Sequence, residues 1–104
     1  MVYTQTTVNM DEIVDIIVKK YGPIEKVIVF GSHARQEADE YSDLDLIIIK
    51  NTSQGFVERL VSVPQLPIHA DIFVYTPEEF QRMQEDENPF IISALTNSII
   101  IYEK

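Results

Sequence analysis

The spacing of apolar residues along the chain predicts four β-strands. Residues 27–30, 44–49, 68–75 and 99–102 are short runs rich in β-branched and aromatic side chains. The run at residues 44–49 is apolar nearly throughout, which is typical of a strand that is covered on both faces of a sheet. We therefore expect this run to lie in the middle of a four-stranded sheet.

Helical periodicity and capping signals occupy the segments between these strands. Asn9 precedes the first helix, and Thr76 with Glu79 forms a capping box before a later one. The expected helices cover residues 10–21, 33–38, about 54–61, a segment from residue 77 onwards, and 90–96; the first eight residues are expected to be a loose lead-in. This order predicts an α+β fold, in which a four-stranded mixed sheet is flanked by helices.

Length and composition restrict the class of protein. The chain has 104 residues, enough for one domain and too few for two, so we expect a single domain over residues 1–104. Cysteine is absent, so any metal ion must be held by oxygen or imidazole ligands. The sequence has neither an apolar stretch of membrane-spanning length nor a signal-peptide pattern. We expect a cytoplasmic protein without membrane contact.

The charge balance argues against direct contact with nucleic acid. The formal net charge is −9, from 17 acidic and 8 basic residues. Such a surface repels a phosphate backbone, because sequence-independent affinity for nucleic acid comes from lysine and arginine. A cationic protein partner fits this charge. A nucleoside triphosphate fits it only when metal ions lie between the negative charges.

Two short motifs on either side of a polar connection carry the candidate chemistry. Gly31-Ser32 ends the first expected strand, and Asp43 and Asp45 open the second. A connection this short favours an antiparallel pair, which brings both motifs to the same edge of the sheet. Glycine permits a sharp turn and the close approach of a phosphate. Ser32 offers an amide and a hydroxyl at an expected helix N-terminus, where an anion is favoured.

Three aspartates form the predicted metal site. Asp43 and Asp45 are two residues apart on a strand, so their side chains share a face, and Asp71 reaches that face if its strand pairs beside theirs. Two carboxylates about 4 Å apart repel by roughly 4 kcal/mol at an effective dielectric of about 20, unless a cation is present. Oxygen ligands of this kind suit two Mg²⁺ ions, or Mn²⁺. We expect the three aspartates to be catalytic, with Asp71 helping to deprotonate an acceptor hydroxyl.

These motifs resemble those of the polymerase-β-like nucleotidyltransferase superfamily. The resemblance rests on Gly31-Ser32-His33-Ala34-Arg35, Ser42-Asp43-Leu44-Asp45-Leu46 and Asp71. More closely, the chain is similar to the minimal nucleotidyltransferases, small proteins that often pair with a HEPN-domain partner as toxin–antitoxin modules. The resemblance implies the polymerase-β-like fold, Gly31 and Ser32 as ligands of the triphosphate, and the three aspartates as ligands of the metal. It also implies ATP as the substrate and transfer of AMP to a hydroxyl, often of a tyrosine, on the HEPN toxin.

Two further residues, Arg35 and Ser42, are candidate nucleotide ligands. Each also has a simpler role, because Arg35 can pair with Glu37 or Asp39 and Ser42 can support the turn before the aspartates. The chain departs from the family pattern at two positions of this segment. Position 36 is glutamine where many relatives have glycine, and position 33 is histidine where arginine is frequent.

The motifs are compatible with two functions. The first is an enzyme, a protein adenylyltransferase that modifies a toxin partner and so acts as an antitoxin. The second is a binding module, a non-catalytic antitoxin or nucleotide sensor that neutralises a basic toxin by covering it. An enzyme that modifies a small metabolite fits less well, because the chain leaves no room for an acceptor-binding domain.

Overall fold

The computed structural model describes residues 9–39 and 42–104, so the lead-in expected at residues 1–8 lies outside the described part. The elements are, in chain order, α1 (Met10–Tyr21), β1 (Lys26–Phe30), β2 (Leu44–Ile49), α2 (Phe56–Ser62), β3 (Ala70–Tyr75), α3 (Pro77–Glu85), α4 (Pro89–Thr96) and β4 (Ile99–Glu103). The four expected strands and four of the five expected helices are confirmed. None of the helices described here has the length and apolar character needed to span a membrane.

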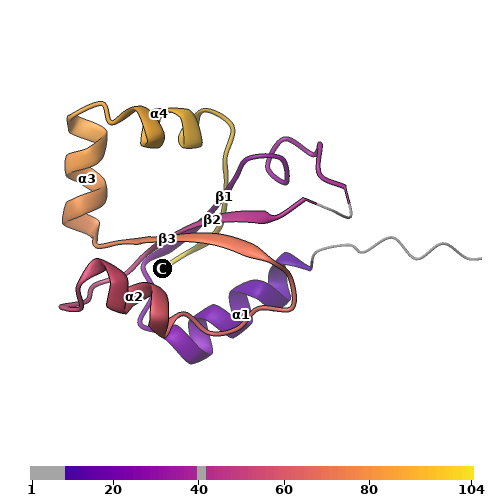
Figure 1. Ribbon diagram of the computed structural model, residues 1–104, viewed down its shortest axis with the longest axis horizontal. Helices are drawn as coiled ribbons and strands as arrows, with labels where there is room; N and C mark the ends of the chain where they lie inside the picture. The colour runs from indigo at the N-terminus through magenta and orange to yellow at the C-terminus, as the bar shows by residue number, and fades with distance from the viewer. Residues whose placement is uncertain (1–8, 40–41) are drawn as a thin grey trace, which may run out of the picture.

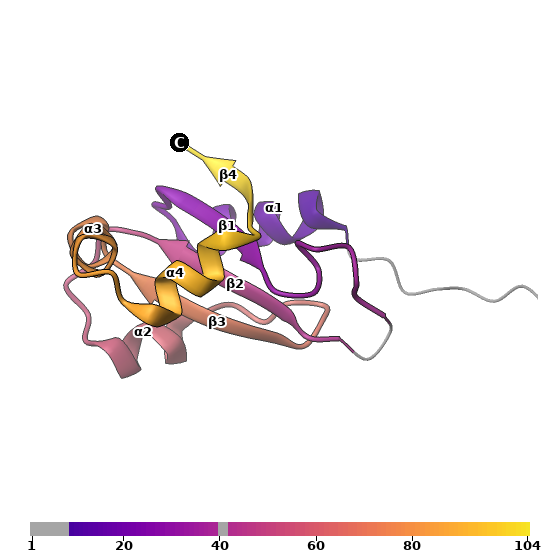
Figure 2. The same ribbon diagram turned by 90° about the horizontal axis from the view of Figure 1, so that it is seen from above.

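The four strands form one mixed sheet in the order β3-β2-β1-β4. Strand β1 is antiparallel to both β2 and β4, whereas β2 is parallel to β3. Helix α1 covers one face of the sheet, α3 and α4 cover the other, and α2 lies against β3 (Figure 1 and Figure 2). The α+β fold with a mixed, helix-flanked sheet is therefore confirmed.

The prediction of a helix at residues 33–38 is wrong. Residues 31–36 form a tight turn instead. Gly31 and Gln36 adopt left-handed backbone conformations, with φ of 74° and 61°, and L-residues do not continue a right-handed helix from that region. The amides of Ala34 and Arg35 both donate to the Gly31 carbonyl oxygen at 3.1 Å. The segment is thus limited to about one turn, although its polar composition favoured a helix.

The residues of β2 alternate between two apolar cores. One set packs toward α1 and the other toward α3 and α4: Leu44, Leu46 and Ile48, then Ile47 and Ile49. Residues two apart on a strand share a face, so Asp45 lies on the face of α3 and α4. It is the one charged residue in an otherwise apolar strand. The predicted central position of β2 in the sheet is confirmed. Asp45 is the exception to the apolar character of this strand.

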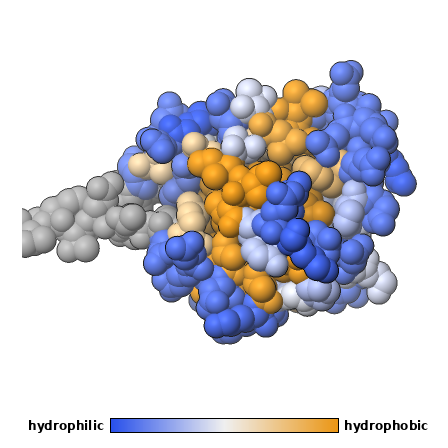
Figure 3. Space-filling model, turned by 180° about the vertical axis from the view of Figure 1, so that it is seen from behind, coloured by the Kyte–Doolittle hydropathy of each residue, from blue (hydrophilic) through white to orange (hydrophobic). Residues whose placement is uncertain are grey.

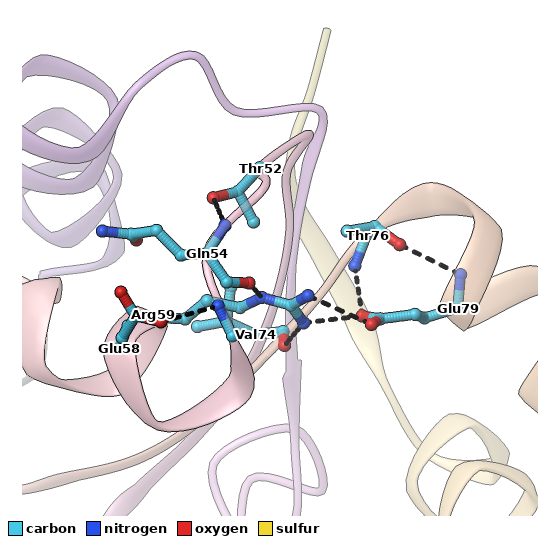
Figure 4. A network of polar contacts seen from close by, with 8 residues as sticks. Thr52, Gln54, Glu58, Arg59, Val74, Thr76 and Glu79 are labelled. Carbon is cyan, nitrogen blue, oxygen red and sulfur yellow. Dashed lines mark hydrogen bonds and ion pairs between the residues drawn. The ribbon is translucent and has the colours of Figure 1, made fainter.

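Helix α2 is attached to the sheet through a buried arginine. Arg59 is only 6% exposed, and its guanidinium donates to both carboxylate oxygens of Glu79 at 2.6 and 3.1 Å (Figure 4). It also donates to the carbonyl oxygens of Gln54 at 2.9 Å and Val74 at 3.2 Å. The Tyr21 hydroxyl donates to the Arg59 carbonyl oxygen at 2.7 Å. The buried charge is thereby paired and hydrogen-bonded, as burial of a charge requires.

The edge strand β4 presents apolar side chains to the surface. Ile99 and Ile100 are 44% and 50% exposed, and Ile92 of α4 is 48% exposed. Seen from the side opposite to Figure 1, apolar surface gathers in the middle of the face (Figure 3). The register of β4 against β1 is irregular at Val27 and Ile28. Such an irregularity disfavours pairing of an edge strand with a further strand.

We expect the pair of Arg59 and Glu79 to make the stability of the fold depend on pH. The hydrogen bond from Arg59 is the largest cause that lowers the pKa of Glu79. The stabilisation is therefore fully present above the ordinary glutamate pKa and is lost as the pH falls through the lower pKa of the folded state. Urea unfolding of Glu79→Gln should show a loss of about 1.5 kcal/mol at neutral pH, and a smaller loss below about pH 4.

Glu78→Gln is the matched control for this measurement. Glu78 precedes Glu79 in the first turn of α3 and is exposed. Its replacement should change the free energy of unfolding by less than about 0.5 kcal/mol. Equal losses for the two variants would contradict the role of the pair.

Candidate active site

Three strands bring the predicted residues together at one edge of the sheet. Asp45 is the register partner of Phe30 on β1 and of Asp71 on β3. Gly31 directly follows Phe30, and Asp43 lies two residues before Asp45. Since neighbouring strands are about 4.8 Å apart, Asp45 stands between the Gly31 turn and Asp71. The antiparallel pairing of the first two strands and the neighbouring third strand are both as the sequence predicted.

Asp45 is affected by the charge of both other aspartates. Its pKa is raised above the ordinary aspartate value, first by burial and then by the negative charges of Asp71 and Asp43. His33 and Arg35 lower the pKa of Asp45, and their influence is weaker. The three carboxylates therefore form one electrostatic cluster, in which the charged form of Asp45 is disfavoured without a cation.

The donor set suits a hard divalent cation. All three side chains are carboxylates, the ligands that Mg²⁺ and Mn²⁺ prefer; Asp43 and Asp71 are exposed and Asp45 is half-buried. Within residues 9–39 and 42–104, no three His, Cys, Asp or Glu side chains are already arranged as a set of metal ligands. The backbone brings the three aspartates to one edge of the sheet, so binding of an ion by all three would require movement of their side chains.

Gly31 shapes the turn and makes room for Asp45. Its φ of 74° lies in the left-handed region, which glycine adopts without strain. A Cβ atom at this position would overlap Asp45 Oδ2 and would lie 3.2 Å from Asp45 Cγ. The carboxylate of Asp45 can therefore lie against the turn only because residue 31 has no side chain.

Two successive amides of the Gly31 turn make no backbone hydrogen bond with the residues that the structure describes. Its hydrogen bonds use the amides of residues 34, 35, 36 and 37. In the part of the chain that the structure describes, the amides of Ser32 and His33 take part in none of these bonds. Successive free amides in a turn form a concave site for an anion. Ser32 is thus a candidate phosphate ligand within a turn, and not at the helix N-terminus that the sequence suggested.

Ser42 and His33 hold the loop that precedes Asp43. The Ser42 hydroxyl donates to Asp39 Oδ1 at 3.2 Å and accepts from the Asp39 amide at 3.1 Å. The Nε2 atom of His33 lies 3.3 Å from the Ser42 carbonyl oxygen. Ser42 therefore supports the turn, which was the simpler of its two predicted roles. Its contact with a nucleotide stays a prediction.

Arg35 forms one wall of a small pocket beside Gly31. Its Nε donates to Glu37 Oε1 at 2.6 Å, which confirms the ion pair that the sequence suggested. The pocket has a volume of about 220 Å³. Its other walls are Phe30, Phe90, Ser93, Ala94 and Asn97. Helix α4 thus adds an aromatic ring and a hydroxyl to the surroundings of the Gly31 turn, and its C-cap Asn97 adds an amide.

The sequence did not predict this contribution of α4. Phe30, Phe73 and Phe90 form an aromatic cluster with ring centroids 6.1, 5.7 and 4.7 Å apart. The sequence could have indicated that two of these residues lie near the site, because Phe30 precedes Gly31 and Phe73 lies two residues after Asp71 on the same face of the strand. For Phe90 no local signal exists, since the position of α4 over the sheet depends on tertiary packing.

Comparison with known proteins identifies the family of the chain. The family model described as Polymerase beta, Nucleotidyltransferase matches residues 11–104. The chain belongs to this nucleotidyltransferase family. A relative from Methanocaldococcus jannaschii, a candidate protein adenylyltransferase, is 30% identical over 105 residues, which are 91% of this chain and 70% of the relative. The prediction that the chain is a nucleotidyltransferase of the polymerase-β-like superfamily is confirmed.

Solved structures share the fold of this nucleotidyltransferase. A candidate nucleotidyltransferase from Sulfolobus solfataricus has a TM-score of 0.60 at 16% identity, over 91% of this chain and 77% of that chain. A toxin–antitoxin structure with AMP-PNP has a TM-score of 0.65 at 13% identity, over 93% and 75%. A mutant of the toxin–antitoxin pair MntA–HpeT has a TM-score of 0.61 at 12% identity, over 93% and 75%. At these identities the likeness concerns the fold.

The nucleotidyltransferase departs from its family's pattern at a strained position. Gln36 has a φ of 61°, a conformation that costs a residue with a side chain roughly 1–2 kcal/mol. Glycine, which the family resemblance suggests at this position, adopts this conformation without that cost. The backbone of the turn therefore has a conformation that favours glycine, although residue 36 is glutamine.

Replacing Gly31 by alanine should destabilise the nucleotidyltransferase by roughly 1–3 kcal/mol, because the residue is left-handed and the new Cβ meets Asp45. Asp45→Ala removes the overlapping carboxylate, so the same replacement should cost less in that background. Urea unfolding of the wild type, both single variants and the double variant should give a coupling of at least about 0.5 kcal/mol. The same cost in both backgrounds would mean that the carboxylate does not press on the glycine.

Proposed function

We propose that the protein is a metal-dependent adenylyltransferase that transfers AMP from ATP to a hydroxyl of a HEPN-type toxin, a tyrosine by the family resemblance, and so acts as an antitoxin. The observation that carries this proposal is the placement of Asp43, Asp45 and Asp71 at one sheet edge beside the Gly31 turn. Membership of the nucleotidyltransferase family supports the type of reaction. The adenylyltransferase name of the M. jannaschii relative supports a protein as acceptor.

The reaction replaces one phosphorus–oxygen bond by another. The acceptor oxygen bonds to the α-phosphorus of ATP while the bond from that phosphorus to the bridging oxygen of the β-phosphate breaks, and pyrophosphate leaves. The hydroxyl proton passes to Asp71, an exposed carboxylate on the edge strand β3 that a protein acceptor can approach. With Asp43 and Asp45, it would hold two Mg²⁺ ions, which when bound neutralise phosphate charge and acidify the acceptor hydroxyl.

The Gly31 turn receives the triphosphate in this proposal. Gly31 lets a phosphate approach the backbone, and the amides of Ser32 and His33 are available as donors. The adjacent pocket of about 220 Å³ offers space for the nucleoside, with Phe90 as an aromatic wall and Asn97 as a hydrogen-bonding group. Positioning of this kind supplies much of the catalysis in phosphoryl-type transfers.

Arg35 and Ser42 have a conditional place in this site. Arg35 is paired with Glu37, and the Ser42 hydroxyl is bonded to Asp39. Either residue would contact the phosphates only after it exchanges its present partner for a phosphate oxygen. For Arg35 the exchange is favourable, because the exposed pair with Glu37 contributes little by itself.

A toxin partner is supported by two independent observations. Structural neighbours include toxin–antitoxin pairs, one of them with AMP-PNP. The net charge of −9 also favours a cationic protein over a nucleic acid as the partner.

Transfer of label from ATP should distinguish this reaction from its alternatives. With Mg²⁺ and the purified product of the neighbouring gene as acceptor, label on the α-phosphate should move to that protein and label on the γ-phosphate should not. Asp45→Asn and Asp71→Asn should each lower the rate at least about 100-fold. Asp15→Asn, in an exposed ion pair on α1, should keep the wild-type rate. Transfer of γ-label, or of no label, would argue against nucleotidyl transfer.

Neutralising Asp45 should stabilise the metal-free protein. Burial and the charges of Asp71 and Asp43 raise the pKa of Asp45, so the folded state binds the proton more tightly than the unfolded chain does. Stability then falls as the pH rises from the ordinary aspartate pKa through the raised one. In EDTA at neutral pH, Asp45→Asn should melt at a higher temperature than the wild type.

Addition of metal should reverse this order of stability. Mg²⁺ binds only the folded site, so it should raise the melting temperature of the wild type. The Asp45→Asn variant lacks one ligand and should respond much less. A wild-type melting temperature that neither Mg²⁺ nor Mn²⁺ changes would contradict the metal site.

Neutralisation by binding alone is the second candidate function. It is favoured by the finding that, in the described residues, the carboxylates are not already arranged as metal ligands. The double variant Asp43→Ala with Asp45→Ala separates the two functions in cells that express the toxin. Full protection by this variant would establish the binding module, and loss of protection would establish the need for catalysis.

A further inference from the structure

Helix α2 carries its apolar residues on the outside. Four of its residues share the spacing i, i+1, i+4 and i+5, which places them on one face of a helix. These residues, named here the α2 face, are Phe56, Val57, Leu60 and Val61, and they are 48%, 72%, 41% and 81% exposed. The one buried residue of the helix is the charged Arg59. The helix is therefore amphipathic in the opposite sense from a helix that packs on a core.

Polar contacts of Arg59 attach α2 to the sheet, and Phe56 of the α2 face adds a ring contact with Tyr75, with centroids 6.2 Å apart. Arg59 holds the helix through Glu79 and two carbonyl oxygens (Figure 4). The Tyr21 hydroxyl donates to the Arg59 carbonyl oxygen. Among the described residues, Val57 and Val61 belong to neither apolar core. An apolar face that the fold does not bury is typical of an interaction surface.

We propose that the α2 face docks a protein partner whose own patch is apolar and bordered by lysine and arginine. From position 36 to position 81 the chain has two cations, Lys50 and Arg59, and both are buried. Glu58 is exposed on α2 itself. The cation of α2 itself is thus buried while its carboxylate is exposed, and the chain as a whole has a net charge of −9. A basic border on the partner complements this charge.

A second copy of this chain fits the α2 face poorly. Each copy has a net charge of −9, and a twofold contact through α2 would bring two copies of Glu58 toward each other. A standard interface buries about 800 Å² per partner, more than four partly exposed side chains of a seven-residue helix can supply. The remaining contact must come from surface outside the α2 face, and a basic partner is favoured there by the net charge of −9.

The α2 face and the carboxylates lie toward opposite ends of the sheet. Strand β2 starts beside Asp43 and runs for six residues, about 20 Å, before the chain enters the segment that leads to α2 (Figure 1). A partner docked on α2 leaves the Gly31 turn accessible. Docking and nucleotidyl transfer are therefore separable. The identity of the partner as the toxin acceptor rests on the proposed function.

The test replaces the two most exposed residues of the α2 face by charged ones. Val57→Asp with Val61→Asp should keep the wild-type melting temperature, because both residues are mostly exposed. Its affinity for the purified product of the neighbouring gene, measured by calorimetry, should fall at least about tenfold. Ile92→Asp is the matched control, since Ile92 is an apolar residue of α4 with 48% exposure; it should bind as the wild type does.

Two further measurements separate docking from the transfer site. Asp43→Asn with Asp45→Asn should lose transfer but bind the partner with wild-type affinity, and Val57→Asp with Val61→Asp should still bind ATP with Mg²⁺. Affinity of the wild type should fall as NaCl is raised from about 50 to 300 mM, because the charged border is screened. If the variant Val57→Asp with Val61→Asp unfolds, Val61→Gln alone should also weaken binding of the partner.

Four results would overturn the docking proposal. They are unchanged affinity in the folded α2 variants, an equal loss of affinity in Ile92→Asp, no complex between the wild type and this partner, and a wild-type homodimer in light scattering that the α2 variants dissociate. None of these results affects binding of ATP with Mg²⁺. Failure of the proposed nucleotidyl transfer would show separately, as a wild type that neither binds the nucleotide nor responds to metal.

Discussion

Repulsion between the three carboxylates is the constraint on which the site depends, and the apolar core enforces it. Leu44 and Leu46 pack toward α1 while Ile47 packs toward α3 and α4, so a shift of β2 by one residue would move every side chain to the wrong face. The register that buries the apolar residues also places Asp45 opposite Asp71. The fold therefore holds like charges together, and a divalent cation is the ligand that relieves the repulsion between them.

The same constraint explains the Gly31 turn. Asp45 is crowded on one side by Asp71 and on the other by the backbone of residue 31, where a Cβ would overlap its carboxylate. The carboxylate cluster and the turn are therefore in direct contact through Asp45 and Gly31. A phosphate bound in the turn would lie beside the ions that the carboxylates would hold. In the proposed function, this nearness of donor amides and acidic metal ligands is what would let a chain with a net charge of −9 accept a triphosphate.

Sequence reasoning succeeded where the determining interactions are local. Asn9 and Thr76 predicted the starts of α1 and α3, and their side chains do cap those helices. The uniformly apolar run of β2 predicted the central position of that strand. Prediction from the sequence failed where the structure depends on an unusual backbone conformation or on a partner that is distant in sequence. Nothing in the composition of residues 33–38 revealed that Gln36 would be left-handed. Arg59 resembled an ordinary surface residue of a weak helix, because its partner Glu79 lies twenty positions away.

The inverted helix α2 follows from that distant pair. Once Arg59 is buried against Glu79 and the Val74 carbonyl oxygen, helical geometry forces the opposite, apolar side outward. The fold thereby presents an apolar face outside its cores, held by the polar contacts of Arg59 and by the ring contact of Phe56 with Tyr75. In the two proposals, negative charge serves different purposes: the carboxylates at one end of the sheet would hold metal ions and through them a nucleotide, and the net charge of −9 would favour a basic partner on the α2 face. A single small domain can in this way hold a protein partner and keep its carboxylates free.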